Sequence, residues 1–374
     1  GAGRGGGGGG VFRRLWARPR APRPIPRRRN AARGRQAGGA PDNLVAMNPA
    51  LPTGAAGARP VVPLALAATT LALLLGLQPV TTDMYLPAFP LLTRELGAGM
   101  AQAQLTMAAL ILAFGVAQLV WGPLADKHGR RPVLLLGLSL YAVASLGCVL
   151  ADGITDLVVW RALQGAAMAA AVVCARAIVR DLYEPVQGAQ VMSMALTGLG
   201  LIALASPLLG GAAAHAIGWR GALALVAAIG LGTLAWVAWR LPETLARPNP
   251  AATRPAALWR TAREVGRHPV FVAWALLVAC TYGGLFTLLA GSSFIYIDVL
   301  GLSPAAYGLA MAAGSLAYIA GTLVCRRWIT RHGLAGTVGR GGFFTLAAGA
   351  LAVALALAGA ARWAAVLLPQ CLCL

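Results

Sequence analysis

The sequence predicts an all-α integral membrane protein with about ten apolar helices in two bundles. Three observations support this class. First, 58% of the residues are hydrophobic and only 11% are charged, whereas roughly 25% are charged in soluble domains. Second, apolar stretches of about 20 residues recur, which is the length that crosses about 30 Å of hydrocarbon. Third, basic residues beyond the N-terminal segment gather on alternate connections, as in membrane proteins.

Residues 1–46 differ from the rest of the chain. Six consecutive glycines end at Gly10, and eleven arginines mixed with prolines face the single acid Asp42. Such a segment has too little apolar surface to fold, and no apolar core with a cleavage site follows, as a secretory signal would need. Three interpretations stay open: a disordered basic arm near anionic lipid, an RNA-binding arm, and translated sequence upstream of the true start. The third is favoured, because the chain opens with Gly1 and Met47 stands directly before the first apolar run.

Eight of the predicted helices follow from apolar stretches without charge. One further helix is expected over 156–176 although Arg161 interrupts it, and a tenth begins near Trp363 and runs out at Leu374. The eight clear stretches are 61–82, 101–125, 132–151, 187–215, 221–239, 270–297, 304–325 and 341–361.

The basic residues predict the orientation. With the N-terminus in the cytoplasm, the connections on that side carry fifteen Lys and Arg residues, and those on the other side carry Arg94, Arg220 and Arg362. Short loops with Lys and Arg resist translocation, so the N-terminus is expected to be cytoplasmic.

The longest internal connection divides the chain. We expect a six-helix bundle over 47–240, a cytoplasmic linker over 241–269, and a second bundle over 270–374 with about four of six helices present. A weak repeat supports the division, because a basic turn follows the second helix of each half, over 126–131 and over 326–333.

Soluble chemistry is not indicated. The sequence has no phosphate-binding loop, no His/Glu metal motif and only four histidines, so neither an enzyme, a metal site nor a bound cofactor is expected. A primary pump would need a nucleotide-binding domain, which these residues do not provide. Cys148, Cys174, Cys280 and Cys325 have no His or Cys at metal-ligand spacing, and Cys371 and Cys373 stand alone near Leu374. We interpret the six cysteines as buried small apolar residues.

The motif with the most specific spacing is Gly122–Pro132, GPLADKHGRRP. A basic turn alone explains its arginines but not Gly122, Asp126 and Gly129 at these intervals. Glycine permits close backbone approach and a tight turn. Asp126 can pair with Arg130 and can meet the positive N-terminus of a facing helix.

These residues resemble the major facilitator superfamily, and within it the Bcr/CflA group of drug/proton antiporters. The resemblance covers about 47–374 and includes the stretches 82–90, 161–165 and 198–211. One position departs from the pattern: Ser206 precedes Pro207 where many relatives have glycine, which weakens the inference of antiport. Packing of helices is an alternative role for these glycines. The gating motif that the resemblance implies comprises Gly122, Asp126, Gly129, Arg130 and Arg131. The antiporter motif comprises Pro207, Gly210 and Gly211.

The resemblance implies proton-coupled export of drugs or other small molecules by alternating access. The proton gradient would supply the energy, and the partners would be a small-molecule substrate, the proton and membrane lipid, with no nucleic acid. The implied protein is a monomer in the bacterial inner membrane. Alternatives are another facilitator-type metabolite exporter, a symporter, an inactive truncated carrier, and a nucleic-acid or scaffold role for the basic arm. Since the second bundle is short, we expect the 374-residue chain to insert but to transport poorly.

Two ionisable residues are candidates for proton coupling. Arg161 lies within a membrane helix, where a cation is costly unless it faces a partner or a cavity; the alternative is that it reaches the nearby surface. Asp83 closes the first helix, either as an interfacial helix-end residue or as a carboxyl group that carries protons.

Aromatic, Met and amide side chains within the spans are candidates for a central substrate cavity, although most of them would serve packing. No acidic cluster demands a cationic substrate, so neutral and amphipathic compounds are equally compatible. The candidates are Tyr85, Phe114, Gln118, Met168, Tyr282, Phe286 and Tyr296.

Overall fold

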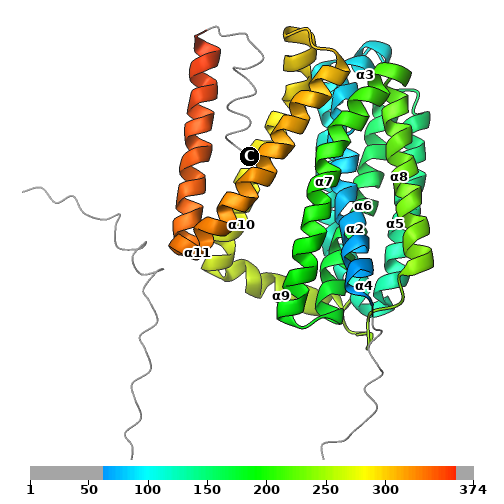
Figure 1. Cartoon of the computed structure of the whole chain (residues 1–374). Coiled ribbons are helices and arrows are strands. Elements are labelled where there is room, and N and C mark those ends of the chain that lie inside the picture. The colour runs from blue at the N-terminus through cyan, green and yellow to red at the C-terminus, as the bar shows by residue number, and fades with distance from the viewer. Residues whose placement is uncertain (1–61, 359–374) are drawn as a thin grey trace, which may run out of the picture. The chain divides into compact units, whose positions relative to one another are not determined.

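The computed structural model describes residues 62–358 (Figure 1). In this part every regular element is a helix, and 9 segments are long and apolar enough to cross a membrane, which confirms the all-α membrane class. The predictions for 1–46, for Met47 and for a helix near Trp363 concern residues outside this range. The elements are α2 (Leu64–Asp83), η1 (Leu86–Ala88), α3 (Phe89–Glu95), α4 (Met100–His128), α5 (Arg130–Leu150), α6 (Ile154–Leu182), α7 (Pro185–Ile217), α8 (Trp219–Arg240), α9 (Pro255–Arg267), α10 (Pro269–Ser293), η2 (Phe294–Val299) and α11 (Pro304–Leu357).

The first span is longer than the predicted stretch 61–82. α2, η1 and α3 follow one another and together cover Leu64–Glu95. The helical path continues past Asp83 because Pro87 and Pro90 lie at the starts of η1 and α3, where the missing N–H costs no helical hydrogen bond. The extension buries Tyr85 and Phe89 completely.

α11 combines the two predicted stretches 304–325 and 341–361. Its backbone leaves helical geometry at Gly333, where φ is 69° and ψ is 176°. The two arms, Pro304–Ile329 and Gly336–Leu355, are separate candidate spans. Gly129, between α4 and α5, also has a positive φ, 99°. Both turns of the predicted repeat therefore reverse the chain at a glycine in a conformation that other residues rarely adopt.

Helices α2 to α8 pack around buried small residues. α6 packs against α4 and α5, while α2 packs against α7. Ala169, Ala170 and Ala171 are fully buried in α6, and small side chains let membrane helices approach closely. The side chains of Leu112 and Leu119 on α4 are exposed on the protein surface, so lipid can contact them.

The prediction that the cysteines are buried is only half right among the four that the structure describes. Cys148 and Cys174 are buried, whereas Cys280 of α10 and Cys325 of α11 are exposed. Both exposed residues lie in apolar spans, where lipid rather than protein can cover a small thiol. Cys371 and Cys373 lie outside the described residues.

The connection between the halves contains a helix, α9, that sequence analysis did not predict. It follows an irregular segment after Arg240, and only His268 separates it from α10. His268 is extended, with φ −77° and ψ 113°, as expected for a residue that precedes a proline. The chain therefore turns sharply between α9 and α10.

Candidate functional site

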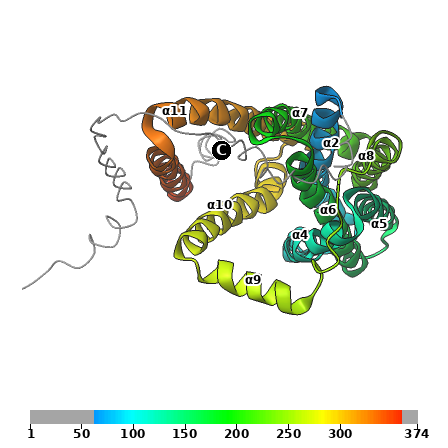
Figure 2. The same ribbon diagram turned by 90° about the horizontal axis from the view of Figure 1, so that it is seen from below.

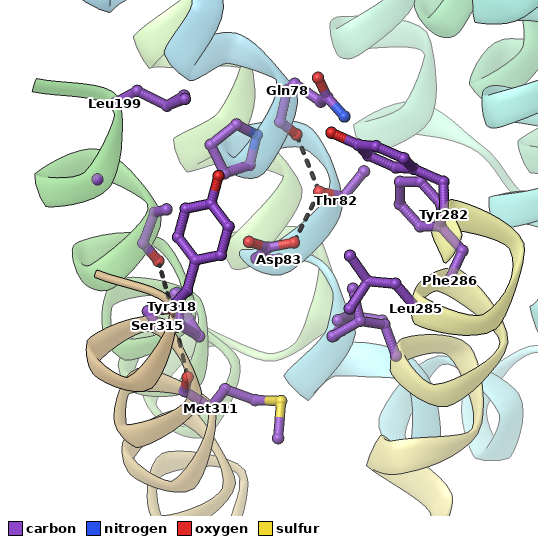
Figure 3. Close-up of a pocket in the computed structure, with 16 residues that line it drawn as sticks. Gln78, Thr82, Asp83, Leu199, Tyr282, Leu285, Phe286, Met311, Ser315 and Tyr318 are labelled. Carbon is purple, nitrogen blue, oxygen red and sulfur yellow. Dashed lines mark hydrogen bonds between the residues drawn. The ribbon is translucent and has the colours of Figure 1, made fainter. Parts of the chain in front are cut away.

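A cavity of about 200 Å³ lies between four spans, α2, α7, α10 and α11. Most of its lining is apolar or aromatic, and Asp83 is the only charged residue among the described residues that line it (Figure 3). The lining residues are close to the middle of their spans. They are Gln78, Pro79, Thr82, Asp83, Leu86, Leu199, Gly200, Ala203, Pro207, Tyr282, Leu285, Phe286, Leu289, Met311, Ser315 and Tyr318.

Asp83 has a hydrogen-bonding environment that suits a protonated carboxyl group. The hydroxyl of Thr82 lies 2.7 Å from Asp83 Oδ1 and 3.0 Å from the carbonyl oxygen of Gln78. A hydroxyl has one proton and two lone pairs. When Asp83 is ionised, Thr82 can therefore serve only one of these oxygens. When Asp83 carries a proton, it can donate to Thr82 while Thr82 donates to Gln78, so both contacts are hydrogen bonds.

Aromatic rings from the second half form the opposite side of the cavity. The rings of Tyr282 and Phe286 on α10 lie 6.1 Å apart with an interplanar angle of 34°, and Tyr318 reaches the cavity from α11. Ser315 of α11 donates to the carbonyl oxygen of Ala203 on α7, at 3.3 Å. The two halves thus meet directly at the cavity.

Arg161 lies behind α2 and is fully buried. Its guanidinium donates to the carbonyl oxygen of Thr81 at 3.2 Å and to Gln164 Oε1 at 2.8 Å, and it stacks over the ring of Tyr85 at 4.2 Å. Among the described residues, no carboxylate lies within ion-pair distance of it, so the structure does not bring Arg161 and Asp83 together. Arg161 instead contacts Thr81, which precedes Asp83 by two residues on the same helix.

A buried polar network surrounds Arg161. Gln164 Nε2 donates to the hydroxyl of Ser145 at 2.7 Å, and Ser145 in turn donates to the carbonyl oxygen of Tyr141. The hydroxyl of Tyr141 lies 2.6 Å from that of Thr81. The side chain of Arg161 therefore bonds inside the bundle in this structure and does not reach the surface.

The cavity candidates from the sequence separate into two groups. Tyr282 and Phe286 line the cavity, whereas Tyr85, Met168 and Tyr296 are fully buried in the packed core. Phe114 packs partly against that core. Neither it nor Gln118 is among the lining residues. Sequence analysis missed Gln78, Thr82, Ser315 and Tyr318.

The turn between α4 and α5 is held by an ion-pair cluster. Arg130 pairs with Asp126 at 2.6 Å, as predicted, and also with Asp181 of α6 at 2.8 Å. Arg131 donates to the carbonyl oxygen of Ala238 on α8. Close approach at Gly122 is not seen, because an added Cβ would lie 3.9 Å from Val173, an ordinary contact distance.

The linker contributes a residue to this turn that the sequence did not indicate. The Glu243 carboxylate accepts from the backbone N–H groups of Arg130 and Arg131, at 2.9 and 3.1 Å. It occupies the positive N-terminus of α5, where an anion is stabilising. Farther along the linker, Asn249 N–H donates to the carbonyl oxygen of Asp126 at 2.8 Å. The linker is thus fastened to the first half.

Residues 71–373 match the sequence model of the Major Facilitator Superfamily. The chain belongs to the Major Facilitator Superfamily. It is therefore a multi-pass membrane protein of a transporter family, and the predicted resemblance is confirmed.

Curated relatives in the superfamily carry resistance or transporter names. The chain is 33% identical to the uncharacterized MFS-type transporter YdgK of Bacillus subtilis, over 69% of this chain and 66% of that protein. It is 28% identical to the bicyclomycin resistance protein homolog of Haemophilus influenzae (71% and 66%) and 33% identical to the chloramphenicol resistance protein of Pseudomonas aeruginosa (73% and 64%). The chain spans about two thirds of the length of these relatives.

Solved structures show the same fold. A bacterial homolog of the human lysosomal transporter Spinster, inward-facing and unoccupied, aligns with a TM-score of 0.64 at 17% identity, over 83% of this chain and 73% of that one. The D-xylose–proton symporter aligns with a TM-score of 0.59 at 14% identity, over 82% and 78%.

The glycines of the predicted antiporter motif lie at a close crossing between helices. A Cβ at Gly210 would collide with the carbonyl oxygen of Met84, and one at Gly211 would approach that of Pro304. On α11, a Cβ at Gly308 would collide with the carbonyl oxygen of Pro207. The motif therefore lets α7 pack tightly against both α2 and α11, which supports a packing role for its glycines.

Proposed function

We propose that this superfamily member exports drugs or other small molecules in exchange for protons. The observation that carries the proposal is the cavity between the two halves, which has one carboxyl group, Asp83, in a setting that suits its protonated form. The names of the relatives add bicyclomycin and chloramphenicol resistance as the biological context.

In the proposed mechanism, proton and substrate compete for the cavity. The lining of Tyr282, Phe286 and Tyr318 suits an amphipathic compound with an aromatic group, since aromatic rings bury large areas in specific geometries. A substrate that contacts ionised Asp83 or its Thr82 partner is displaced when a proton arrives from outside. Return of the proton to the cytoplasm then restores the site. Only the proton gradient is needed as an energy source.

Arg161 is proposed as a positioning residue for this exchange. It holds the carbonyl oxygen of Thr81 with both terminal nitrogens, two residues before Asp83 on the same helix. A shift of Arg161 toward another acceptor would move the last turn of α2. The guanidinium thus connects the buried network of the first half to the acid in the cavity.

We also propose the location and orientation. The protein would lie in the bacterial inner membrane as a monomer, with its N-terminus in the cytoplasm. The basic turns at Gly129 and Gly333 would then face the cytoplasm, in agreement with the charge bias of the connections. The ion pair between Arg94 of α3 and Asp298 of η2, at 2.7 Å, would lie at the outer end.

Symport is the second candidate, because Ser206 replaces the glycine expected before Pro207. Its hydroxyl donates to the carbonyl oxygen of Ile202 within α7, and it does not line the cavity. Counterflow distinguishes the two modes: an outward substrate gradient should drive protons inward in an antiporter and outward in a symporter.

The proposal is tested with a panel of compounds that includes bicyclomycin and chloramphenicol. Cells that express the chain should accumulate less of at least one compound, and an uncoupler should abolish the difference. Because the chain spans only part of its relatives, binding is measured in parallel on the purified protein. A bound compound should be released as the pH falls, together with proton uptake. Absence of both binding and uncoupler-sensitive export across the panel would refute the proposal.

A further inference from the structure

The linker helix α9 has two chemically distinct faces. Leu258, Ala262 and Val265 follow the spacing i, i+4, i+7 and therefore share one face. Arg260, Arg263 and Arg267 share the other by the spacing i, i+3, i+7. Trp259 lies at the border of the two, next to Arg263 at i+4. An apolar stripe with an aromatic border and an arginine-rich opposite face is typical of helices that lie in a membrane interface.

Among residues 62–358, the apolar face of α9 is largely uncovered and its arginines have no acidic partner. Trp259 is 73% exposed, Leu258 40% and Val265 39%, and among the described helices α9 packs chiefly against α10. The three arginines form no ion pair with a carboxylate of the described residues. The helix has one acid of its own, Glu264. It therefore presents uncovered apolar area together with unneutralised positive charge.

The position of α9 along the chain limits what can cover it. The span of α8 ends at Arg240 and that of α10 begins at Pro269, so both ends of the linker are held at the membrane surface. Only His268 separates α9 from α10, and the chain turns sharply there. In Figure 1 α9 runs across this end of the bundle, and in Figure 2 it lies at the margin of the helices. The bilayer surface is thus within reach of the whole helix.

We infer that α9 is an interfacial helix that binds the anionic headgroups of the protein's own bilayer. The apolar stripe inserts between headgroups and acyl chains, about 5–10 Å deep. The arginine side chains are long enough to reach phosphate oxygens from the flanks of the helix. Because Glu243 and Asn249 fasten the preceding linker to the first half, lipid bound to α9 also restrains the start of α10.

The test measures immersion depth by spin labelling of the whole chain in lipid nanodiscs. Single cysteines are placed on the apolar face, Ala262→Cys or Val265→Cys, and on the opposite face, Ala256→Cys or Glu264→Cys. Cys280, Cys325, Cys371 and Cys373 are replaced by alanine, while the buried Cys148 and Cys174 remain. In discs with phosphatidylglycerol, labels on the apolar face should be more accessible to oxygen and the others to a water-soluble nickel chelate. Equal accessibility of both faces would overturn the inference.

A comparison of two triple variants tests whether the arginines of α9 bind the anionic headgroups. Replacement of Arg260, Arg263 and Arg267 by glutamine should reduce the contrast between faces to the level found in phosphatidylcholine discs. Replacement of Arg247, Arg331 and Arg340 by glutamine removes the same charge elsewhere and should leave the contrast unchanged. Full contrast in the first variant would overturn the inference. The inference would also be overturned if both faces of α9 were accessible to water and the detergent-purified chain bound a short RNA through these three arginines. Both leaflets of a nanodisc have one composition, so the result does not depend on the proposed orientation.

Discussion

At the scale of single residues, Asp83 is the charged group that the cavity offers to a proton. Replacing it by Asn keeps the size of the side chain and removes the exchangeable charge. We expect Asp83→Asn to bind substrate without pH dependence and to lose accumulation against a gradient. Substrate binding by the purified chain over a pH series measures this. Asp156→Asn, in the first turn of α6 and outside the cavity lining, is the control. Normal pH dependence in Asp83→Asn would make Asp83 structural.

Arg161 allows a test that separates positioning from stability. An isolated cation within the membrane is costly, and its removal offsets the penalty of about 1–3 kcal/mol for each acceptor left without a donor, the carbonyl oxygen of Thr81 and Gln164 Oε1. Arg161→Met should therefore insert and keep its thermal midpoint within about 5 °C. It cannot hold the carbonyl oxygen of Thr81, and we expect the pH dependence of substrate binding to shift. A variant with normal pH dependence at normal stability would refute the positioning role.

At the scale of elements, the turn between α4 and α5 distinguishes two glycines of one motif. At Gly129, φ is +99° and a Cβ would approach the Glu243 carboxylate. With ψ at 158°, this backbone conformation is essentially restricted to glycine, and the strain for another residue costs about 1–3 kcal/mol, so Gly129→Ala should lower the thermal midpoint. Gly122→Ala has room and should stabilise α4 slightly, by at most about 1 kcal/mol. Thermal unfolding in one detergent compares the two. Equal losses would show that the turn geometry is not what requires glycine.

Charge-free length predicted eight of the nine described spans, because it depends only on composition along the chain. The ninth, Ile154–Leu182, was expected although Arg161 interrupts its apolar stretch. Which side of a span faces a neighbour was not predictable in this way, since lipid is as apolar as the core. Tyr85 and Met168 were therefore indistinguishable from Tyr282 and Phe286.

The sequence repeat held more information about which residues meet than the sequence analysis used. Arg94 and Asp298 are 204 residues apart, as are Gly129 and Gly333. The same separation relates the candidate Phe114 to Tyr318, a cavity residue that sequence analysis missed. The apolar spacing of the amphipathic helix α9, at Leu258, Ala262 and Val265, was also present in the sequence.

At the scale of the whole molecule, corresponding positions of the two halves meet at one end. Arg94 and Asp298 form an ion pair at 2.7 Å, with side chains 68% and 35% exposed. Nearby, the rings of Phe89 and Phe294 lie 6.1 Å apart, and both are buried. An exposed ion pair contributes about 0.2–1 kcal/mol, whereas burial of a Phe side chain contributes about 1.5–3 kcal/mol and an aromatic pair about 0.5–1.5 kcal/mol more. The apolar contact should therefore dominate closure of this end.

These magnitudes predict a graded response that distances between spin labels on α3 and η2 can measure. Arg94→Asp alone removes an attraction of up to about 1 kcal/mol and adds a repulsion of similar size, so it should shift the population away from the closed end by at most about thirtyfold, since 1.4 kcal/mol corresponds to tenfold. Arg94→Asp combined with Asp298→Arg should restore closure at low salt, and added salt should weaken both effects. Phe89→Ala should open this end more than the charge reversal does, with little dependence on salt. If the charge reversal has the larger effect, then electrostatics rather than apolar packing closes this end of the carrier.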